Sequence, residues 1–470
     1  MPSSKPESFR RIPAVDTVLR EMGTEWLAAG VPRQVVVDCV RAAVAQVRQS
    51  LASAGAIESD EASIRRTIAE QATLGVRAAM RPHYRRVINA TGIILHTALG
   101  RAVLPTRAIR QIQEELSGYS LVQVDVETGK RSKRDERIEW LLRRLTGAEA
   151  ATVVNNNAAA TAIVLTTVAK GREVIVSRGQ LVEIGGSFRL PDVMATAGAK
   201  LVEVGTTNKT HLRDYEQAIT ENTAALLRVH PSNYKISGFT AEVPLAQLVQ
   251  LGHARGLVVI DDVGAGPLID FSRFGFEREP TLPESVATGA DIITSSADKL
   301  IGGSQGGIIL GRASLIQAVR KNPWARIVRP GKLALAALEA TLTLFLDESV
   351  ALREVPTLRM LRRPLTEIGA QAERIVRTLS ERGAGVTVRA IDGCSQMGSG
   401  SLPTQDLPTR LVAIETEPSQ AGELARRLRL HDPPVFVRVH RGQVLVDPRT
   451  LLDGDEQIVV NALLAALTIP

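Results

Sequence analysis

The stretch DIITSSADKLIGGSQGGIILG, residues 291–311, contains the pattern that decides the fold. Its outer segments, DIITSS and GGIILG, are strand-like, and the turn between them holds Lys299 and several glycines. Neither segment alternates apolar and polar residues, which is typical of strands buried on both faces. Lysine is rarely buried unless it is paired or reactive. The stretch therefore predicts two buried strands with an amine between them, although a surface lysine in a polar turn has the same local pattern.

Strand-like runs of the same kind alternate with helix-like segments over residues 89–335. Further short runs rich in β-branched residues occur there: ATVVN, EVIVS, KLVEVG, ALLRVH and LVVIDD. Helix-like segments such as NAAATAIVLTTVA and LAQLVQLGHARG lie between several of them. Alternating strands and helices indicate a mostly parallel sheet that is covered by helices. We therefore expect a large α/β domain over residues 89–335.

The regions on either side have different sequence patterns and predict different secondary structure. Residues 1–88 show apolar residues at helical spacing and hold 13 Lys or Arg against 9 Asp or Glu. We expect a small helical domain there that binds nucleic acid, forms a dimer or covers a site. For residues 336–470 we expect a linker helix and a small α+β domain in which HRGQ forms a hairpin turn. The segment DGCSQMGSGSLPTQDLP, residues 392–408, is too rich in glycine and proline to predict regular structure.

Composition excludes several classes of protein. No apolar run is long enough to span a membrane, and no secretory signal is recognisable, so we expect a cytoplasmic protein. The two cysteines and seven histidines show no metal-binding spacing, so we expect no metal site. The net charge of +7 is compatible with a polyanionic partner and equally with an arginine-rich genome. An aromatic content of 3% argues against base-stacking platforms.

Three elements of the α/β region carry chemistry when they are taken together. Asn156 and Asn157 open a helix after a strand, and a helix start binds anions. Asp261 and Asp262 end another strand, where open α/β sheets bind ligands. Each element alone has a plain structural explanation. A phosphate cradle, a carboxylate and the amine of Lys299 are, in combination, what pyridoxal phosphate requires. A GxxxxGK[ST] loop and a GxGxxG after the first strand are both missing, which argues against nucleotide binding.

Long ordered motifs give the sequence a family resemblance. They include RRVINATGIILHTALGRAVL, TGAEAATVVNNNAAA, SRGQLVEIGGSFRLPDVM, VHPSNYKISGFT, DDVGAG, SADKLIGGSQGGII, KNPWARIVRPGKLALAALEATL, GSGSLPT and GQVLVDPRTL. The chain resembles the bacterial selenocysteine synthase family, the L-seryl-tRNA(Sec) selenium transferases. The resemblance implies a pyridoxal-phosphate enzyme of fold type I. The chain departs from the family's usual motifs at several positions, among them Ala98, Ala297, Ser304 and Gly307.

The resemblance also implies roles for individual residues. Lys299 would bind the cofactor as a Schiff base and act as the base, and Asp298 would serve as an acid. Asp262 would pair with the pyridinium nitrogen, although the residues alone leave Asp261 open because neighbours on a strand point to opposite faces. The cofactor phosphate would lie at Asn156, Asn157 and Ala158, and the ring near His230, Ser232 and Asn233. An anionic donor, selenophosphate, would bind Arg101, Arg326 and Arg329, whose guanidinium groups suit phosphate oxygens.

The implied reaction converts seryl-tRNA(Sec) to selenocysteinyl-tRNA(Sec) by β-elimination to an aminoacrylate, followed by selenium addition. The resemblance further implies that residues 1–88 bind tRNA rather than DNA, and that the chain forms a homo-oligomer, a ring of dimers. Two other readings remain open. One is a pyridoxal-phosphate lyase or desulfurase acting on a free amino acid or amino sugar. The other is a non-catalytic tRNA-binding homologue.

Overall fold

The computed structural model describes residues 11–22, 26, 29–53, 60–185, 188–383, 385–402, 405–417 and 419–468. The chain divides into two compact units, Met1–Arg86 and Val87–Pro470, which we describe separately. The first ten residues, where a secretory signal would lie, fall outside the described residues. Within the described parts, no helix combines the length and the apolar character that crossing a membrane requires.

The first unit is helical, as the apolar spacing predicts. Its helices include α1 (Val15–Glu21), α3 (Arg33–Ser53) and α4 (Glu61–Met80). Their apolar faces form one core in which Val40 and Val44 of α3 meet Ile64 and Ile68 of α4. Asp60 caps α4, because its carboxylate accepts a hydrogen bond from the Ser63 amide at 2.7 Å.

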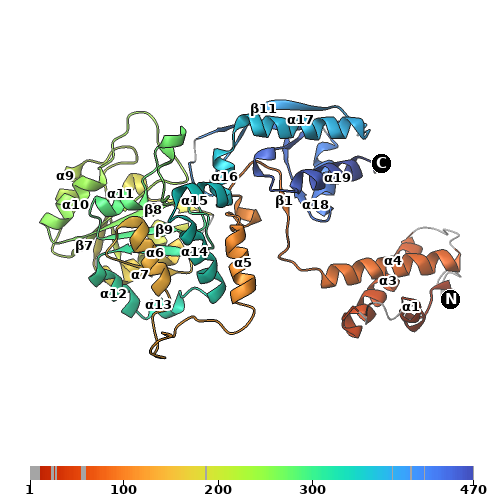
Figure 1. Cartoon of the computed structure of the whole chain (residues 1–470), viewed down its shortest axis with the longest axis horizontal. Helices are drawn as coiled ribbons and strands as arrows, with labels where there is room; N and C mark the ends of the chain where they lie inside the picture. Colours follow the sequence, from red (N-terminus) through yellow and green to blue (C-terminus); the bar gives the residue numbers. More distant parts are fainter. Residues whose placement is uncertain are drawn as a thin grey trace, which may run out of the picture. The chain divides into compact units, whose positions relative to one another are not determined.

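In the second unit, one seven-stranded sheet has the order β2-β10-β9-β8-β7-β3-β6. Figure 1 labels β7, β8 and β9 of this sheet among the surrounding helices. The strands are β2 (Ala150–Val154), β3 (Glu173–Ser177), β6 (Lys200–Val204), β7 (Thr223–Val229), β8 (Val258–Gly264), β9 (Ile292–Ser296) and β10 (Gly307–Gly311). Strand β10 is antiparallel to both of its neighbours, whereas the strands from β9 to β6 are parallel. The mostly parallel sheet predicted from the sequence is confirmed.

Helices cover both faces of this sheet. The helices of this region are α5 (Thr106–Glu115), α6 (Glu136–Thr146), α7 (Asn157–Val168), α8 (Leu190–Thr196), α9 (Leu212–Ala218), α10 (Leu245–Ala254), α11 (Leu282–Ala287), α12 (Ala313–Lys321), α13 (Trp324–Ile327), α14 (Lys332–Leu344), α15 (Glu348–Glu354) and α16 (Pro356–Arg362). Helices α6 to α12 contact the sheet, whereas α5 and α15 pack on α14. Neighbouring residues of one strand enter different cores: Ile309 joins the core of α7, α8 and α12, and Ile308 joins that of α6 and α14. Both faces of β10 are therefore apolar, which explains why its residues do not alternate between apolar and polar in the sequence.

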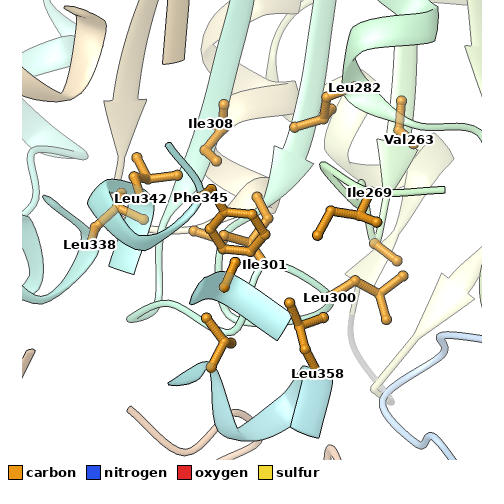
Figure 2. Close-up of a cluster of buried hydrophobic side chains, with 14 of the residues drawn as sticks. Val263, Ile269, Leu282, Leu300, Ile301, Ile308, Leu338, Leu342, Phe345 and Leu358 are labelled. Atoms are coloured by element: carbon orange, nitrogen blue, oxygen red, sulfur yellow. The ribbon is translucent and has the colours of Figure 1, made fainter. Parts of the chain in front are cut away.

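The two residues that follow Lys299 are anchors in the core. Figure 2 shows Leu300 and Ile301 among Phe345 and Leu358, which come from the helical segment after the sheet. Both side chains are almost completely buried. Burying two large aliphatic side chains contributes roughly 1.5–3 kcal/mol each, so the turn that carries the lysine is held firmly.

The C-terminal part of the second unit is a small α+β subdomain. It contains α17 (Leu365–Glu381), α18 (Ala421–Leu430), α19 (Asp455–Leu467), β11 (Val388–Ser395), β12 (Leu407–Glu415), β13 (Val435–Phe436), β14 (Arg438–His440) and β15 (Gln443–Val446). Its sheet has the order β11-β12-β15-β14. As predicted, HRGQ forms a hairpin: Arg441 and Gly442, with φ of +50° and +77°, form the two-residue turn between β14 and β15.

One sequence expectation about this subdomain is wrong. Residues 392–395 were expected to be irregular, yet they complete β11 and pair with residues 407–410 of β12. A Cβ atom at Gly393 would lie 2.4 Å from the Leu411 side chain, so glycine permits the close approach. Pairing with a distant strand overrides the local preference of a glycine-rich segment.

The segment at the start of the second unit lies along this small subdomain. Strand β1 (Ile88–Asn89) pairs in parallel with β13, and the amides of Ile94 and Leu95 donate to the carbonyls of Gln396 and Met397. The chain then forms a short 3-10 helix, Thr97–Leu99, before it reaches Arg101.

Candidate active site

Lys299 lies in the turn directly after β9, and only 5% of its surface is exposed. The turn is closed by main-chain hydrogen bonds from Gly302 to Lys299 and from Gly303 to Ala297, both 2.9 Å. Burial lowers the pKa of the Lys299 amine, as does the positive charge of Arg101, whereas the charge of Asp262 opposes the shift. A lysine with a lowered pKa is a better nucleophile at neutral pH, because more of it is the free amine.

Two of the glycines after Lys299 lie too close to neighbouring atoms for a side chain to fit. Gly302 has φ of +73°, and a Cβ atom on it would lie 2.5 Å from Val355. A Cβ atom on Gly307 would lie 2.1 Å from the carbonyl oxygen of Asn156. The bare backbone therefore lets the lysine turn approach both the core and the start of α7.

Asp262 is the strand-end carboxylate on the α7 side of the sheet. It accepts hydrogen bonds from Asn157 Nδ2 at 2.9 Å and Thr161 Oγ1 at 3.1 Å. Burial raises the pKa of Asp262, and these hydrogen bonds work against that rise. Asp261 is completely buried on the other face, where it pairs with Arg228 at 2.8 Å. The two side chains point to opposite faces of β8, so Asp262 is the one whose carboxylate lies on the α7 side.

Thr161 was not singled out from the sequence. It lies four residues after Asn157, so both side chains occupy one face of α7. That spacing is the signal that could have identified it.

The asparagines open α7 as predicted. Asn156 is its N-cap and accepts a hydrogen bond from the Ala159 amide at 2.9 Å. Ala158 follows as a half-buried residue of the first turn. The Oδ1 atom of Asn157 is buried and has no hydrogen-bond partner among the described residues. A helix start with an unused buried acceptor beside Asp262 is suited to a polar ligand.

His230, Ser232 and Asn233 follow β7, next to Asp262. The His230 amide donates to the Asp262 carbonyl oxygen at 2.9 Å, and His230 Nε2 lies 2.7 Å from Glu279 Oε2. The buried Ser232 hydroxyl has no partner among the described residues. Asn233 Nδ2 instead donates to the carbonyl of Glu183 at 2.8 Å. Glu279 has no recognisable signal in the sequence, since its loop shows no motif.

The structure divides the predicted arginines between two places. Arg101 forms an ion pair with Asp298 at 2.7 Å, directly beside Lys299. Arg326 and Arg329 are exposed and lie near Arg134: burial lowers the pKa of Arg134, and the charges of Arg329 and Arg326 lower it further. Arg134 was also missed, because it is hidden in the basic run KRSKRDER.

The second arginine group lies close to the start of α7. The amide of Asn155, just before the N-cap, donates to the Val328 carbonyl at 2.9 Å. Main-chain contact therefore links the segment of Arg326 and Arg329 to the asparagine turn.

These residues fit pyridoxal phosphate. The Lys299 amine suits its aldehyde, the Asp262 carboxylate suits its ring nitrogen, and the start of α7 suits its phosphate. Buried polar atoms of Asn157, Ser232 and Asn233 that have no partner among the described residues would be free to bond such a ligand. Among the described residues, no group of three or more His, Cys, Asp or Glu side chains is placed to hold a metal ion.

Comparison with known proteins identifies relatives along the whole chain. Residues 87–452 match the family described as "L-seryl-tRNA selenium transferase", and residues 9–48 match "Selenocysteine synthase N terminal". The L-seryl-tRNA(Sec) selenium transferase of Desulfomicrobium baculatum is 47% identical, covering 98% of this chain and 99% of its own length. The enzyme of the same name from Geobacter sulfurreducens is 47% identical, covering 97% and 98%.

A solved structure supports the fold. D-glucosaminate-6-phosphate ammonia-lyase superposes with a TM-score of 0.55 at 22% identity, covering 82% of this chain and 96% of that one. At this identity the likeness shows the fold alone.

Proposed function

This chain belongs to the L-seryl-tRNA selenium transferase family, and from that premise we propose that it converts L-seryl-tRNA(Sec) to L-selenocysteinyl-tRNA(Sec). The chain is thus an enzyme, and its substrate is an amino acid esterified to tRNA. The observation that carries the proposal is the meeting of Lys299, Asp262 and the start of α7 at one edge of the sheet, in a chain that matches the family over nearly its full length.

The cofactor proposed for this site is pyridoxal phosphate, held by Lys299, Asp262, Asn156, Asn157 and Ala158. When bound, it supplies a carbonyl that captures an amine and a ring that accepts negative charge from the α-carbon. The buried Asp262 carboxylate would keep the ring nitrogen protonated. Amides at the start of α7 would hold the phosphate.

The neighbouring residues suit the remaining roles. His230 would lie against the ring, oriented by Glu279, and the free Ser232 hydroxyl would hydrogen-bond near it. Asn233 donates its amide nitrogen to the Glu183 carbonyl, but its buried Oδ1 has no partner among the described residues and would accept a hydrogen bond from the ligand.

Proton transfer falls to Lys299 and Asp298. The lowered pKa of Lys299 leaves its amine free to remove the α-proton of the seryl group. Asp298 would assist departure of the β-hydroxyl, and its partner Arg101 would bind the incoming anionic donor. The donor's selenium atom then bonds to the β-carbon, its bond to phosphorus is broken by water, and phosphate leaves.

We propose selenophosphate as the donor and three arginines as its binding residues, Arg101, Arg326 and Arg329. Arg134 joins this set on the strength of its closeness to Arg326 and Arg329. Mutually repelling guanidinium groups are relieved when a multivalent anion binds among them.

Assembly and placement complete the proposal. Tyr119, Leu121, Val124 and Val126 are exposed, and the first three line a groove of about 630 Å³ together with Trp140 and with Leu335 of α14. A cluster of exposed large apolar side chains favours a second copy of the chain as its cover, in a ring of dimers. We propose that the basic first unit holds tRNA(Sec) through its phosphates, and that the reaction takes place in the cytoplasm, where charged tRNA occurs.

The decisive experiment is incubation of the purified protein with seryl-tRNA(Sec) and selenophosphate, followed by identification of the esterified amino acid. We expect selenocysteine from the wild type and none from Lys299→Ala, which should also lose the cofactor band that borohydride fixes. Lys200→Ala, which removes an exposed lysine from β6, is the matched control and should behave as wild type. Selenocysteine formed by Lys299→Ala at the wild-type rate would refute the assignment.

A second arm tests the acceptor. A protein lacking residues 1–86 should retain the cofactor band and lose salt-dependent affinity for tRNA(Sec). If the full chain shows no salt-dependent affinity for tRNA(Sec), and the deletion causes no loss, the reading in which a free amino acid or amino sugar is the substrate is favoured instead.

A further inference from the structure

Two segments that are distant in sequence meet beside the Arg101–Asp298 pair. One is residues 88–101, which we call the strap. The other is residues 398–402 of the small subdomain, GSGSL, which we call the glycine–serine loop. Neither is explained by the roles assigned above, apart from Arg101 itself.

We propose that the Ser399 hydroxyl of the glycine–serine loop holds the strap so that the Arg101 guanidinium stays on Asp298, which makes Ser399 a positioning residue for the selenium-donor step. The assignment of Arg101 to the donor rests on the proposed function. The physical coupling of Ser399 to Arg101 and Lys299 does not.

The hydroxyl makes the last contacts before the strap leaves the small subdomain. Ser399 Oγ donates to the Leu95 carbonyl at 2.6 Å and lies 3.0 Å from Thr97 Oγ1. Since the serine proton is directed at Leu95, Thr97 donates to Ser399. The Arg101 amide then donates to the His96 carbonyl at 3.0 Å, which closes the turn.

Ser399 and Arg101 both have a strained backbone conformation. Ser399 and Arg101 have φ of +51° and +61°, in the left-handed region that non-glycine residues rarely adopt. Such a conformation costs on the order of 1–3 kcal/mol and persists only where neighbouring contacts impose it. For Arg101, the strap from His96 onward supplies those contacts, and Ser399 restrains that strap.

The glycine–serine loop has no room to shift. A Cβ atom at Gly398 would lie 2.6 Å from Ile93 of the strap, and one at Gly400 would lie 2.8 Å from Asn233. The loop is thus packed between the strap and the segment that follows β7. A movement of Ser399 would therefore displace the strap on one side of the loop and the segment after β7 on the other.

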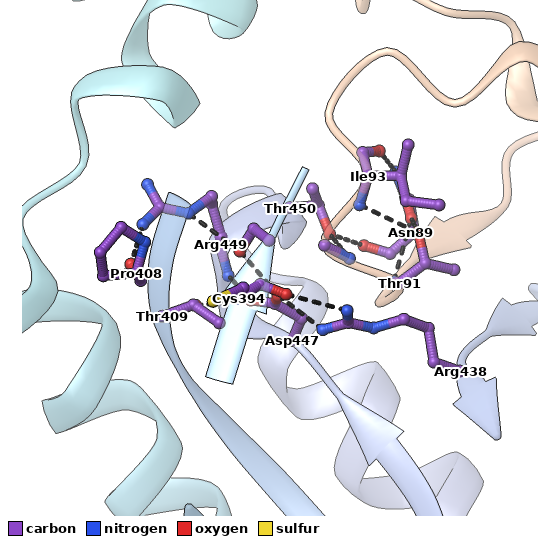
Figure 3. Close-up of polar contacts among 12 residues, drawn as sticks. Asn89, Thr91, Ile93, Cys394, Pro408, Thr409, Arg438, Asp447, Arg449 and Thr450 are labelled. Carbon is purple, nitrogen blue, oxygen red and sulfur yellow. Dashed lines mark hydrogen bonds and ion pairs between the residues drawn. The ribbon is translucent and has the colours of Figure 1, made fainter. Parts of the chain in front are cut away.

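The base of both segments is rigid. Figure 3 shows the buried Asp447 carboxylate surrounded by hydrogen bonds, among them those from Thr409 at 2.9 Å and Arg438 at 3.1 Å. Asp447 also accepts from Ser395 at 2.7 Å, three residues before the loop begins. A Cβ atom at Gly92 would lie 1.9 Å from Asp447 Oδ2, so the strap is pressed against the same carboxylate. Because these contacts fix the strap and the start of the glycine–serine loop, a shift at Ser399 would not be compensated by movement of the residues around Asp447.

The coupling reaches Lys299 through charge. Arg101 lowers the pKa of Lys299, and Asp298 raises it. If Arg101 leaves its place, the lowering contribution is lost, and the pKa of Lys299 rises.

The test compares Ser399→Ala with Ser419→Ala, which removes an exposed serine hydroxyl from the same subdomain. In the holoenzyme, loss of the hydroxyl that bonds both Leu95 and Thr97 in Ser399→Ala should raise the KM for selenophosphate about three- to tenfold and leave the KM for seryl-tRNA(Sec) unchanged. Ser419→Ala should match the wild type in both constants. An unchanged donor KM in Ser399→Ala would overturn the proposal.

A double-mutant cycle tests whether Ser399 acts through Arg101. Combined with Arg101→Ala, the Ser399→Ala change should add nothing, because its target is already gone. Additive losses would show that Ser399 acts in another way. If Ser399→Ala does not fold, Thr97→Val loosens the same contact from the strap side and should raise the donor KM by a smaller factor. An unchanged donor KM in that variant would equally overturn the proposal.

A readout independent of catalysis is the pH profile of pyridoxal phosphate uptake by the full-length apo-protein, since uptake requires the neutral Lys299 amine. Ser399→Ala and Arg101→Ala should both move this profile to higher pH. A wild type that makes no selenocysteinyl-tRNA would refute the proposed function, while this profile would still decide the coupling. Profiles that coincide with wild type would overturn the coupling itself.

Discussion

At the scale of single residues, Lys299 shows how position creates reactivity. Its amine is buried, three carboxylates and one guanidinium group act on it, and burial dominates the shift of its pKa. The sequence indicates the residue but not the shift, because the surrounding charges come from β8 and the strap as well as from its own turn.

The lowered pKa has a measurable consequence for stability. The unfolded chain binds a proton at Lys299 up to its ordinary pKa of 10.5, whereas the folded chain releases that proton at lower pH. The unfolding free energy should therefore rise with pH between the lowered pKa of Lys299 in the folded chain and its ordinary pKa of 10.5. In apo-protein, Lys299→Met should lose this contribution and show a smaller slope in the pH range below 10.5.

Urea unfolding at several pH values would measure both slopes. Lys200→Met replaces an exposed lysine and should keep the wild-type slope. A Lys299→Met variant with the wild-type slope would mean that the amine is not desolvated in the folded apo-protein.

At the scale of elements, the lysine turn and the start of α7 depend on close backbone approach. Gly307 opens β10, and its hydrogen atom faces the Asn156 carbonyl. The glycine was noticed in the sequence, but its contact lies about 150 positions away in the chain, by the numbering of the two residues. Pairing of β2 with β10 creates that contact, and no local pattern encodes it.

Gly307→Ala should therefore push the two elements apart. We expect an overpacking cost of about 1–3 kcal/mol in unfolding free energy, together with weaker retention of pyridoxal phosphate. Denaturant unfolding and the cofactor absorbance after dialysis would measure the two effects.

The matched control is Gly369→Ala in α17, where an added Cβ atom meets nothing within 4 Å. This change should stabilise the protein by about 0.5–1 kcal/mol, because alanine favours helix. Gly307→Ala with wild-type stability and cofactor retention would contradict the packing described for the site.

At the scale of the whole molecule, the exposed apolar surface around residues 119–126 argues for assembly. Leu121 is 68% exposed and lies in the same groove as Tyr119 and Trp140. Leu121→Lys should lower the mass of the particle in light scattering, because a charge would be buried without a partner in the contact between copies.

Leu430→Lys provides the comparison. Leu430 is 67% exposed at the end of α18, away from this groove, and its replacement should leave the mass unchanged. Equal masses for wild type and Leu121→Lys would remove the surface from consideration as the contact between copies.

The sequence by itself determined the α/β class, the lysine between two strands and the helix start at Asn156, because each depends on neighbours within about a dozen positions. It also supplied Arg101 and Asp298, but not their ion pair across 197 positions. Only the tertiary structure decided that Asp262 faces α7 while Asp261 pairs with Arg228, because the face of a strand depends on what packs against it. The same holds for residues 392–395 in β11 and for Ser399 against Leu95, 304 positions apart. Contacts of that range form when separate elements close on one core, and a local pattern does not record which ones will meet.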